Sequence, residues 1–338
     1  MAMVTLGDVF TQGSVVELDV IQSFMDENGD RVNDTPFFQS GILVSNLLVE
    51  AAAASPTAEV TIPYMGRLDS SVEPNYSNDV YEDVAIPHKL DHGFMKARNA
   101  FLNEGWGAMD LVQELTGKDP LAYVAARLGK FWAEQAENRI VATARGIYEL
   151  EAANADMNVT AAVADSIVDT LIDAQLTLGD AFGNIDGYIM DSKTFARAAK
   201  EKLALTTRDP ETSILTKTLN GLPVIVSDRA MVNGDGESVI TLLGRGSFAY
   251  GMANPRVPLA YEREEARGNG GGAETLWTRR NMIVHPMGYN FLSAHITGNG
   301  TETVARSAGW ADLINPANWE RAVDRKGIPL AFVTVANT

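Results

Sequence analysis

The stretch DPLAYVAARLGKFWAEQAENRIVATARGIYELEAAN, residues 119–154, decides the fold. Asp119 is a suitable N-cap, and Pro120 occupies the first helical position, where its missing N–H is not needed. Apolar and small residues then recur every three or four positions, at Leu121, Val124, Ala125, Leu128, Trp132, Ala136, Ile140, Thr143, Ala144, Ile147 and Leu150. The spacing predicts a helix of roughly 50 Å, much longer than an average helix, and such a helix needs an extended surface to lie against.

The chain has the composition of a folded globular protein, with 338 residues, 46% hydrophobic content and no cysteine. Without cysteine it can form no disulfide, thiolate metal site or cysteine nucleophile. No apolar run reaches about 18 residues, and residues 1–20 lack the basic-then-apolar order of a secretion signal, so we expect neither a membrane-spanning helix nor an export signal. The net charge of -17, with no basic run longer than Arg279-Arg280, disfavours direct binding of DNA or RNA. An acidic wall could still line a container for nucleic acid.

Before the long helix, the sequence predicts an arm and a hairpin. Residues 1–55 are interrupted by turn-forming residues and have no evident core of their own, so we expect this arm to dock on another surface. Residues 56–100 predict two strands, near 60–64 and 80–96, on either side of a turn-forming stretch. An isolated hairpin is marginal in water, and this one has too few large apolar residues for a core. We therefore expect contacts between subunits to stabilise it.

After the hairpin, helices and strands alternate. Residues 101–158 predict a short helix over 103–115 followed by the long helix. Residues 159–255 predict an α/β subdomain, with helices over 159–178 and 192–203, the second capped by Ser192, and strands at 188–190, 223–226 and 239–243. Residues 256–338 predict strands at 259–265 and 274–284, paired across a glycine-rich tip, and a last strand at 330–335. The fold class is α+β.

Candidate catalytic and ligand-binding patterns are weak. His88 and His92 lie in a predicted strand, where four residues span about 13 Å, too far apart to share a metal ion. The glycine turn at 244–249 resembles a dinucleotide-binding loop but lacks the following helix and the acidic residue about 20 positions on. His285 and His295 have no evident acidic partner, and no serine lies in a nucleophile elbow. We therefore predict no catalytic residue, cofactor or metal, and no enzyme.

Several short motifs follow one another along the chain in a defined order. They are AMDL at 108–111, GKDP at 117–120, FWAEQ at 131–135, LGDAFGNI at 178–185, MDSKTF at 190–195, GLPVIV at 221–226, TRRN at 278–281, HPMGY at 285–289, NWER at 318–321 and KGI at 326–328. In this order and spacing, from about residue 35 onward, the chain resembles the major capsid (coat) proteins of tailed bacteriophages.

The resemblance implies a phage major capsid fold with an N-terminal arm (1–55), an extended β-hairpin loop (56–100), a spine helix within a peripheral domain (101–158 and 256–338) and an α/β axial domain (159–255). In that family, subunits form pentamers and hexamers that tile an icosahedral shell around double-stranded DNA. The chain would then be part of a virion capsid assembled in the bacterial cytoplasm. The same fold serves encapsulins, so a cellular compartment is an alternative, and an α/β nucleotide-binding enzyme using the 244–249 turn is a third.

The resemblance also implies partners. Some relatives begin with a scaffolding domain that a protease removes, and this chain has no room for one before its hairpin. We therefore expect a separate scaffolding protein and no N-terminal cleavage, together with a portal, possible decoration proteins and packaged DNA held without sequence-specific binding. Charged residues in the hairpin are candidates for contacts between subunits, where charge pairing sets register more than affinity. These candidates are Arg67, Asp69, Glu73 and Lys89.

Overall fold

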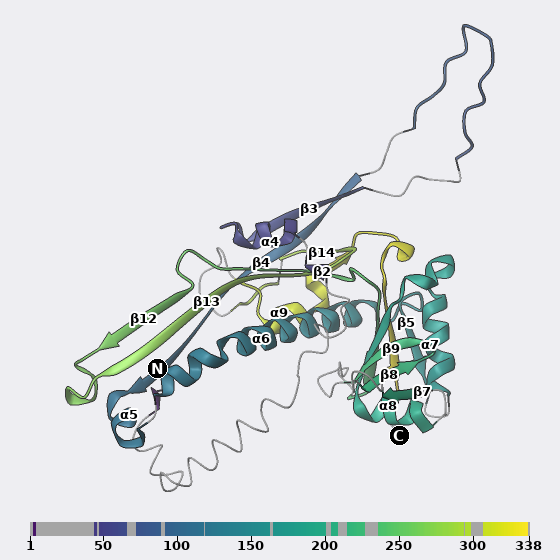
Figure 1. The fold of residues 1–338 in the computed structure, drawn as a ribbon. Helices are drawn as coiled ribbons and strands as arrows, with labels where there is room; N and C mark the ends of the chain where they lie inside the picture. Colours follow the sequence, from purple (N-terminus) through teal and green to yellow (C-terminus); the bar gives the residue numbers. More distant parts are fainter. Residues whose placement is uncertain are drawn as a thin grey trace.

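The computed structural model describes residues 3–4, 44–45, 47–65, 72–88, 92–117, 119–162, 165–200, 204–208, 215–226, 236–293, 295–298 and 307–336. Most of the expected N-terminal arm therefore lies outside the described residues. The described chain forms two seven-stranded sheets, with a long helix lying along the first sheet and the second sheet beyond the end of that helix (Figure 1).

The first sheet has the strand order β1-β4-β13-β11-β2, with β3 also pairing with β4 and β12 with β13. Its strands are β1 (Met3–Val4), β2 (Val44–Ser45), β3 (Glu59–Met65), β4 (His92–Met109), β11 (Phe248–Ala253), β12 (Leu259–Glu264) and β13 (Ala273–Pro286). β13 is covered on both faces, because Met282 and Val284 join one buried core while Ile283, which points the other way, joins another.

The second sheet has the order β5-β16-β10-β6-β9-β8-β7. Its strands are β5 (Asn158–Ala161), β6 (Gly187–Met190), β7 (Ala204–Arg208), β8 (Leu215–Leu219), β9 (Leu222–Val226), β10 (Ser238–Leu243) and β16 (Leu330–Val335). A separate two-stranded ribbon joins β14 (Tyr289–Phe291) to β15 (Trp319–Arg321).

The long helix predicted from the sequence is confirmed as α6 (Pro120–Glu151), which has 32 residues. The Asp119 carboxylate accepts hydrogen bonds from the backbone N–H groups of Leu121 and Ala122, as expected of an N-cap. The helix lies along the first sheet (Figure 1), where Trp132 Nε1 donates to Thr278 Oγ1 at 3.0 Å. Glu137, a charged residue of this helix, is fully buried.

Shorter helices complete both sheets. They are α4 (Leu47–Ala54), α5 (Asp110–Thr116), α7 (Ile167–Leu176), α8 (Ser192–Lys200) and α9 (Trp310–Ile314), with 3-10 turns η1 (Gly179–Asn184), η2 (Arg267–Asn269), η3 (Pro316–Asn318) and η4 (Arg325–Gly327). Helix α4 packs on the opposite face of the first sheet from α6, and α7 and α8 share a buried core with the second sheet. Among the described helices, none is long and apolar enough to cross a membrane.

Two predicted helices begin too early. The helix predicted over 103–115 is a strand as far as Met109 and a helix only over Asp110–Thr116, because β4 pairs with β13 along its whole second half. The helix predicted over 159–178 starts at Ile167, because residues 158–161 form β5 beside β16. In both places a strand partner distant in sequence outweighs the local spacing.

Two other local predictions need correction. Ser192 is the first residue of α8, and the backbone N–H of Thr194 is instead bonded by the Asp191 carboxylate at 3.3 Å, so Asp191 acts as the cap. The strand predicted over 80–96 begins only at His92, since residues 72–88 have no regular secondary structure.

The remaining strand predictions are confirmed, but the pairing crosses one expected boundary. β12 and β13 pair across the glycine-rich tip, and the strands at 188–190, 223–226, 239–243 and 330–335 are present. However, β16 lies in the second sheet between β5 and β10, and β11 lies in the first sheet. The division at residues 255 and 256 therefore does not follow the sheets, because each sheet takes a strand from across it.

Candidate assembly surface and the junction behind it

The loop between β3 and β4 stands away from the body of the subunit (Figure 1). Its described part, residues 72–88, exposes large apolar side chains, with Tyr81 96% and Val84 85% exposed. The other exposed large apolar side chains of this loop are Val72, Tyr76, Val80 and Ile86. Exposed apolar groups gathered in one segment mark an interaction surface rather than a stable free loop.

Polar contacts inside the loop join residues close in sequence and are exposed to solvent. Asn75 Nδ2 donates to the carbonyl of Ile86 at 3.1 Å, and Asn78 Nδ2 donates to Asp83 Oδ2 at 2.6 Å. Each exposed hydrogen bond adds little net stability, because water competes for the same groups. These bonds tie the two limbs of the loop together without giving it a core.

The structure describes one of the four charged residues predicted for contacts between subunits. Glu73 is exposed in the loop, and its Oε1 accepts a hydrogen bond from the hydroxyl of Tyr76 at 2.8 Å. Arg67, Asp69 and Lys89 lie outside the described residues. Their role, like that of Glu73, stays a prediction.

The base of the loop is fixed to the body of the subunit. The Tyr64 hydroxyl donates to the carbonyl of Ala322 at 3.0 Å. Gly93 lies under the Tyr64 ring, where a Cβ atom would be 2.5 Å from the ring, so the close packing needs glycine. Arg98 binds Glu59 at 3.3 Å and Ser293 at 3.0 Å. These contacts therefore fix the ends of β3 and β4, from which the loop extends, relative to the body of the subunit.

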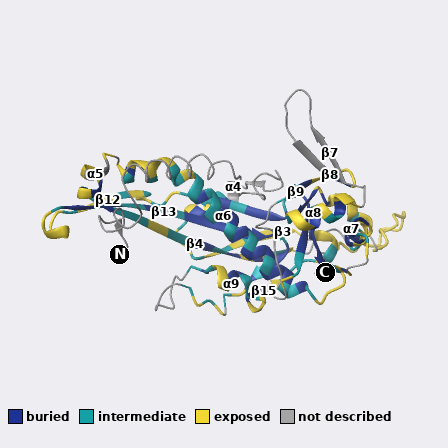
Figure 2. Cartoon of the chain, turned by 90° about the horizontal axis from the view of Figure 1, so that it is seen from below, coloured by how far each residue is buried: buried dark blue, intermediate teal, exposed yellow. Residues whose placement is uncertain are grey.

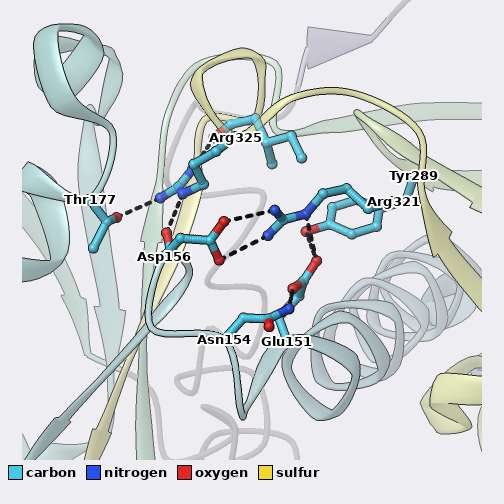
Figure 3. A network of polar contacts seen from close by, with 8 residues as sticks. Glu151, Asn154, Asp156, Thr177, Tyr289, Arg321 and Arg325 are labelled. Carbon is cyan, nitrogen blue, oxygen red and sulfur yellow. Dashed lines mark hydrogen bonds and ion pairs between the residues drawn. The ribbon is translucent and has the colours of Figure 1, made fainter.

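Behind the loop, a charged network joins the two sheets (Figure 3). We call this network the junction; its members include Glu151, Asp156, Tyr289, Arg321 and Arg325. Arg321, at the end of β15, donates through Nε to Glu151 Oε1 at 2.9 Å, and its two terminal nitrogens reach both oxygens of Asp156 at 2.8 and 3.3 Å. The Glu151 side chain is 2% exposed. A bidentate pair of this kind fixes geometry as well as charge. The hydrogen bond from Arg321 lowers the pKa of Asp156.

Arg325 extends the network to the second sheet. Its guanidinium donates to the backbone carbonyl of Asp156, to that of Ile328 at 2.8 Å and to Thr177 Oγ1 at 2.8 Å. On the other side, the Tyr289 hydroxyl donates to Glu151 Oε1 at 3.1 Å, and Asn154 also donates to Glu151. Burial and the nearby Glu151 raise the pKa of Tyr289. The network ties the end of α6, the turn before β5, η4 and the end of α7 together.

Other ionisable groups are buried inside the subunit. Burial lowers the pKa of His285 to about 4, so it is neutral near neutral pH. Arg139 donates to the carbonyl of Ala308 at 3.0 Å, and burial lowers its pKa to about 10. Burial alone would raise the pKa of Asp312, but hydrogen bonds from Thr297, Gly309 and Gly298 lower it overall.

The structure assembles no catalytic arrangement from the residues it describes. The 244–249 turn leads into strand β11 rather than a helix, which a dinucleotide-binding loop requires. Nowhere among the described residues do three or more histidine or acidic side chains group as they would around a metal ion. His88 lies in the loop rather than in the strand we expected, and His92 begins β4.

Sequence reasoning did not identify the junction. Its ion pairs join residues 165 to 170 positions apart, a separation that no local pattern reveals. One signal was present, since Arg321 belongs to the NWER motif that carried the resemblance.

The comparisons with known proteins identify the class. No family model matches the sequence. Over 302 residues the chain is 30% identical to the major capsid protein of Bacillus phage SPP1, covering 86% of this chain and 88% of that protein. The chain therefore belongs to the phage major capsid proteins, which are structural subunits of icosahedral phage heads, and it is part of a virion capsid.

Solved structures show the same fold. A chain from the head of Helicobacter pylori bacteriophage KHP40 matches with a TM-score of 0.53 and 12% identity, over 89% of this chain and 90% of that one. An encapsulin of Synechococcus elongatus matches with a TM-score of 0.45 and 10% identity, over 83% of each chain. That likeness is too low to support the compartment alternative.

Proposed function

We propose that this chain forms pentamers and hexamers by laying the loop between β3 and β4 on a neighbouring subunit. The observation that carries the proposal is the exposed apolar surface of residues 72–88, which has no partner surface among the described residues of its own subunit. Burial of apolar area contributes about 25 cal/mol per Å². Contacts repeated around every subunit then stabilise a closed shell by summation.

Charge would set the register of this contact. Acidic residues predominate in the described part of the loop, which has Glu73, Asp79, Glu82 and Asp83 but no lysine or arginine. A basic surface on the neighbour would match it, with Arg67, Asp69 and Lys89 adding pairs at the ends of the loop. Such pairs select the correct partner and orientation more than they add affinity.

The chain would act by assembly rather than catalysis, without a cofactor. A separate scaffolding protein would direct closure, and a portal and decoration proteins would join the shell. Double-stranded DNA would be enclosed without sequence-specific binding, which suits a chain of net charge -17, since an acidic wall leaves the polymer mobile.

Deletion of residues 68–78 tests the proposal. The deleted and unmodified chains are expressed alone and with a scaffolding protein, then examined by size-exclusion chromatography and negative-stain electron microscopy. We expect closed particles or capsid-like tubes from the unmodified chain, and folded subunits without shells from the deletion. Ser77→Ala, in the same loop, is the matched control and should assemble. Normal shells from the deletion would contradict the proposal, and a co-purifying enzyme inside particles would favour the compartment alternative.

A further inference from the structure

Asn-Gly pairs occur in several turns of this chain. The sequence has them at 28–29, 220–221, 233–234, 269–270 and 299–300, and the structure describes those at 220–221 and 269–270. Asparagine followed by glycine is prone to lose its side-chain amide spontaneously, because no side chain hinders the glycine nitrogen that attacks the amide carbon. The two described pairs have the same chemistry, so they show what the fold adds to it.

Asn269-Gly270 lies at the exposed tip between β12 and β13, at the end of the molecule away from the second sheet (Figure 2). Gly268, Asn269 and Gly270 have φ values of 62°, 58° and 89°. Glycine and asparagine adopt this left-handed region more readily than other residues. Among the described residues, no atom lies within 4 Å of the position that a Cβ on Gly270 would take. This side of the Gly270 backbone is therefore open to solvent.

The pair at the tip is held by backbone hydrogen bonds at the surface. The N–H groups of Gly270 and Gly271 donate to the carbonyl of Gly268, the second at 3.3 Å. Such bonds add little net stability, because water competes for the same groups. Gly268, just before the pair, lies against Met109, where a Cβ would be 2.4 Å from the end of that side chain. Residues 269 and 270 can therefore open locally while the base of the tip stays packed.

The pair at 220–221 is held by two strands. It forms the two-residue turn between β8 and β9, and Leu219 pairs with Leu222 directly beside it. Asn220 and Gly221 have φ values of 52° and 81°, which are typical of such a turn. Leu219 is fully buried. Opening this turn separates the strands and exposes Leu219, so it costs more free energy than opening the tip.

We propose that Asn269 is a site of spontaneous deamidation that the fold leaves open, whereas the fold protects Asn220. The backbone nitrogen of Gly270 attacks Cγ of Asn269 and forms a bond to it. The side-chain amide nitrogen leaves as ammonia and takes the proton of the Gly270 N–H. Water then opens the five-membered succinimide at either carbonyl, which gives aspartate or isoaspartate. The sum consumes water and releases ammonia, so the reaction needs no oxidant and no cofactor.

The new carboxylate changes the charge of the tip. Arg267, two residues before Asn269, is exposed and pairs with Glu264. A carboxylate at position 269 competes with Glu264 for this guanidinium, and it adds a negative charge to a chain whose net charge is already -17. Subunits inside a particle are not replaced. The fraction of modified tips therefore rises with the age of the particle.

Peptide mapping of aged, full-length, unassembled subunits tests the proposal. The chains are incubated in mildly alkaline buffer, either folded or in urea, and then digested with trypsin. Mass spectrometry measures the deamidated fraction in the tryptic peptides 268–279 and 218–229. In the folded chain we expect deamidation at least about tenfold faster at Asn269 than at Asn220, which needs a difference of about 1.4 kcal/mol in opening free energy. In urea the two rates should differ by less than about threefold, because both pairs are then in flexible chain.

Asn269→Gln and Asn220→Gln are matched variants. Glutamine must close a six-membered ring, which forms more slowly, so Asn269→Gln should remove the signal from peptide 268–279. Asn220→Gln should leave that signal unchanged. Asn269→Asp should elute with the aged chain in anion-exchange chromatography, because both carry the added carboxylate.

The proposal is overturned if Asn269 stays unmodified, in the folded chain or in urea. It is also overturned if Asn269 and Asn220 react equally fast in the folded chain, because the fold then makes no difference between them. Neither result bears on the proposed function, since every measurement uses unassembled subunits.

Discussion

The loop between β3 and β4 and the junction around Arg321 differ in how completely their side chains are buried and paired within one subunit. In the junction, Glu151 is nearly inaccessible to solvent and is paired by Arg321, Tyr289 and Asn154. In the loop, Tyr81 and Val84 are almost fully exposed, and the hydrogen bonds are exposed as well. The junction completes itself within one subunit, whereas the loop does not. Stability of the subunit and competence for assembly should therefore be separable by mutation.

The largest effect on stability is expected at the junction. Arg321→Ala leaves the buried Glu151 without its cation, and breaking a buried pair in this way costs about 3 kcal/mol. Urea unfolding of unassembled subunits measures the change. Glu320→Ala, at the exposed neighbouring position, is the control and should stay within about 0.5 kcal/mol of the unmodified chain. A loss below about 1 kcal/mol in Arg321→Ala would show that the network is not what fastens the two sheets.

An intermediate effect is expected from pH through His285. Its pKa is lowered to about 4 in the folded subunit by burial, from an unfolded value of 6.5, so the unfolded chain takes up the proton first as pH falls. The free energy of unfolding is therefore highest, as far as His285 is concerned, above pH 6.5 and decreases as pH falls toward 4. The decrease between pH 7.5 and 5 is about 2 kcal/mol.

Urea midpoints at the two pH values, in unassembled subunits, measure the loss. His285→Gln should flatten the dependence in this window, although the variant starts from a lower stability. The carboxylates of Asp156 and Asp312, whose pKa values are lowered, act only at more acidic pH. An unchanged slope in His285→Gln would assign the pH dependence to other groups.

The smallest effect on stability is expected in the loop, where assembly should suffer most. We expect a change of less than about 0.5 kcal/mol in the free energy of unfolding from the triple variant Tyr81→Ser, Val84→Ser and Ile86→Ser. These side chains are already exposed in the folded subunit, so unfolding exposes little more of them. The same triple variant should form no closed shells in electron micrographs. Ser77→Thr keeps both the apolar and the acidic side chains of the loop and should assemble normally. A large loss of stability in the triple variant would mean that the loop packs on its own subunit.

Local sequence features predicted the elements that depend on local interactions. The Asp119-Pro120 start and the apolar stripe predicted α6, and β16 was predicted with the bounds that it has. The errors at 103–109 and 158–161 come from strands whose partners, β13 and β16, lie about 170 residues further along the chain. Helical spacing of Trp106 and Met109 could not reveal that pairing. The lack of a core in the loop was predicted correctly, and its contact with a neighbouring subunit stays a prediction. The junction could not be predicted, because it depends on contacts between residues distant in sequence.

The position of β16 has a consequence for synthesis. This strand is buried along its whole length and lies between β5 and β10, both of which precede it in the chain by many residues. On the ribosome, β5 and β10 are synthesised before β16, so both have unpaired backbone groups and exposed apolar side chains until β16 is made. The second sheet is complete only when translation has passed residue 335. We therefore expect prematurely terminated chains, which lack β16, to have an incomplete second sheet and to be excluded from shells.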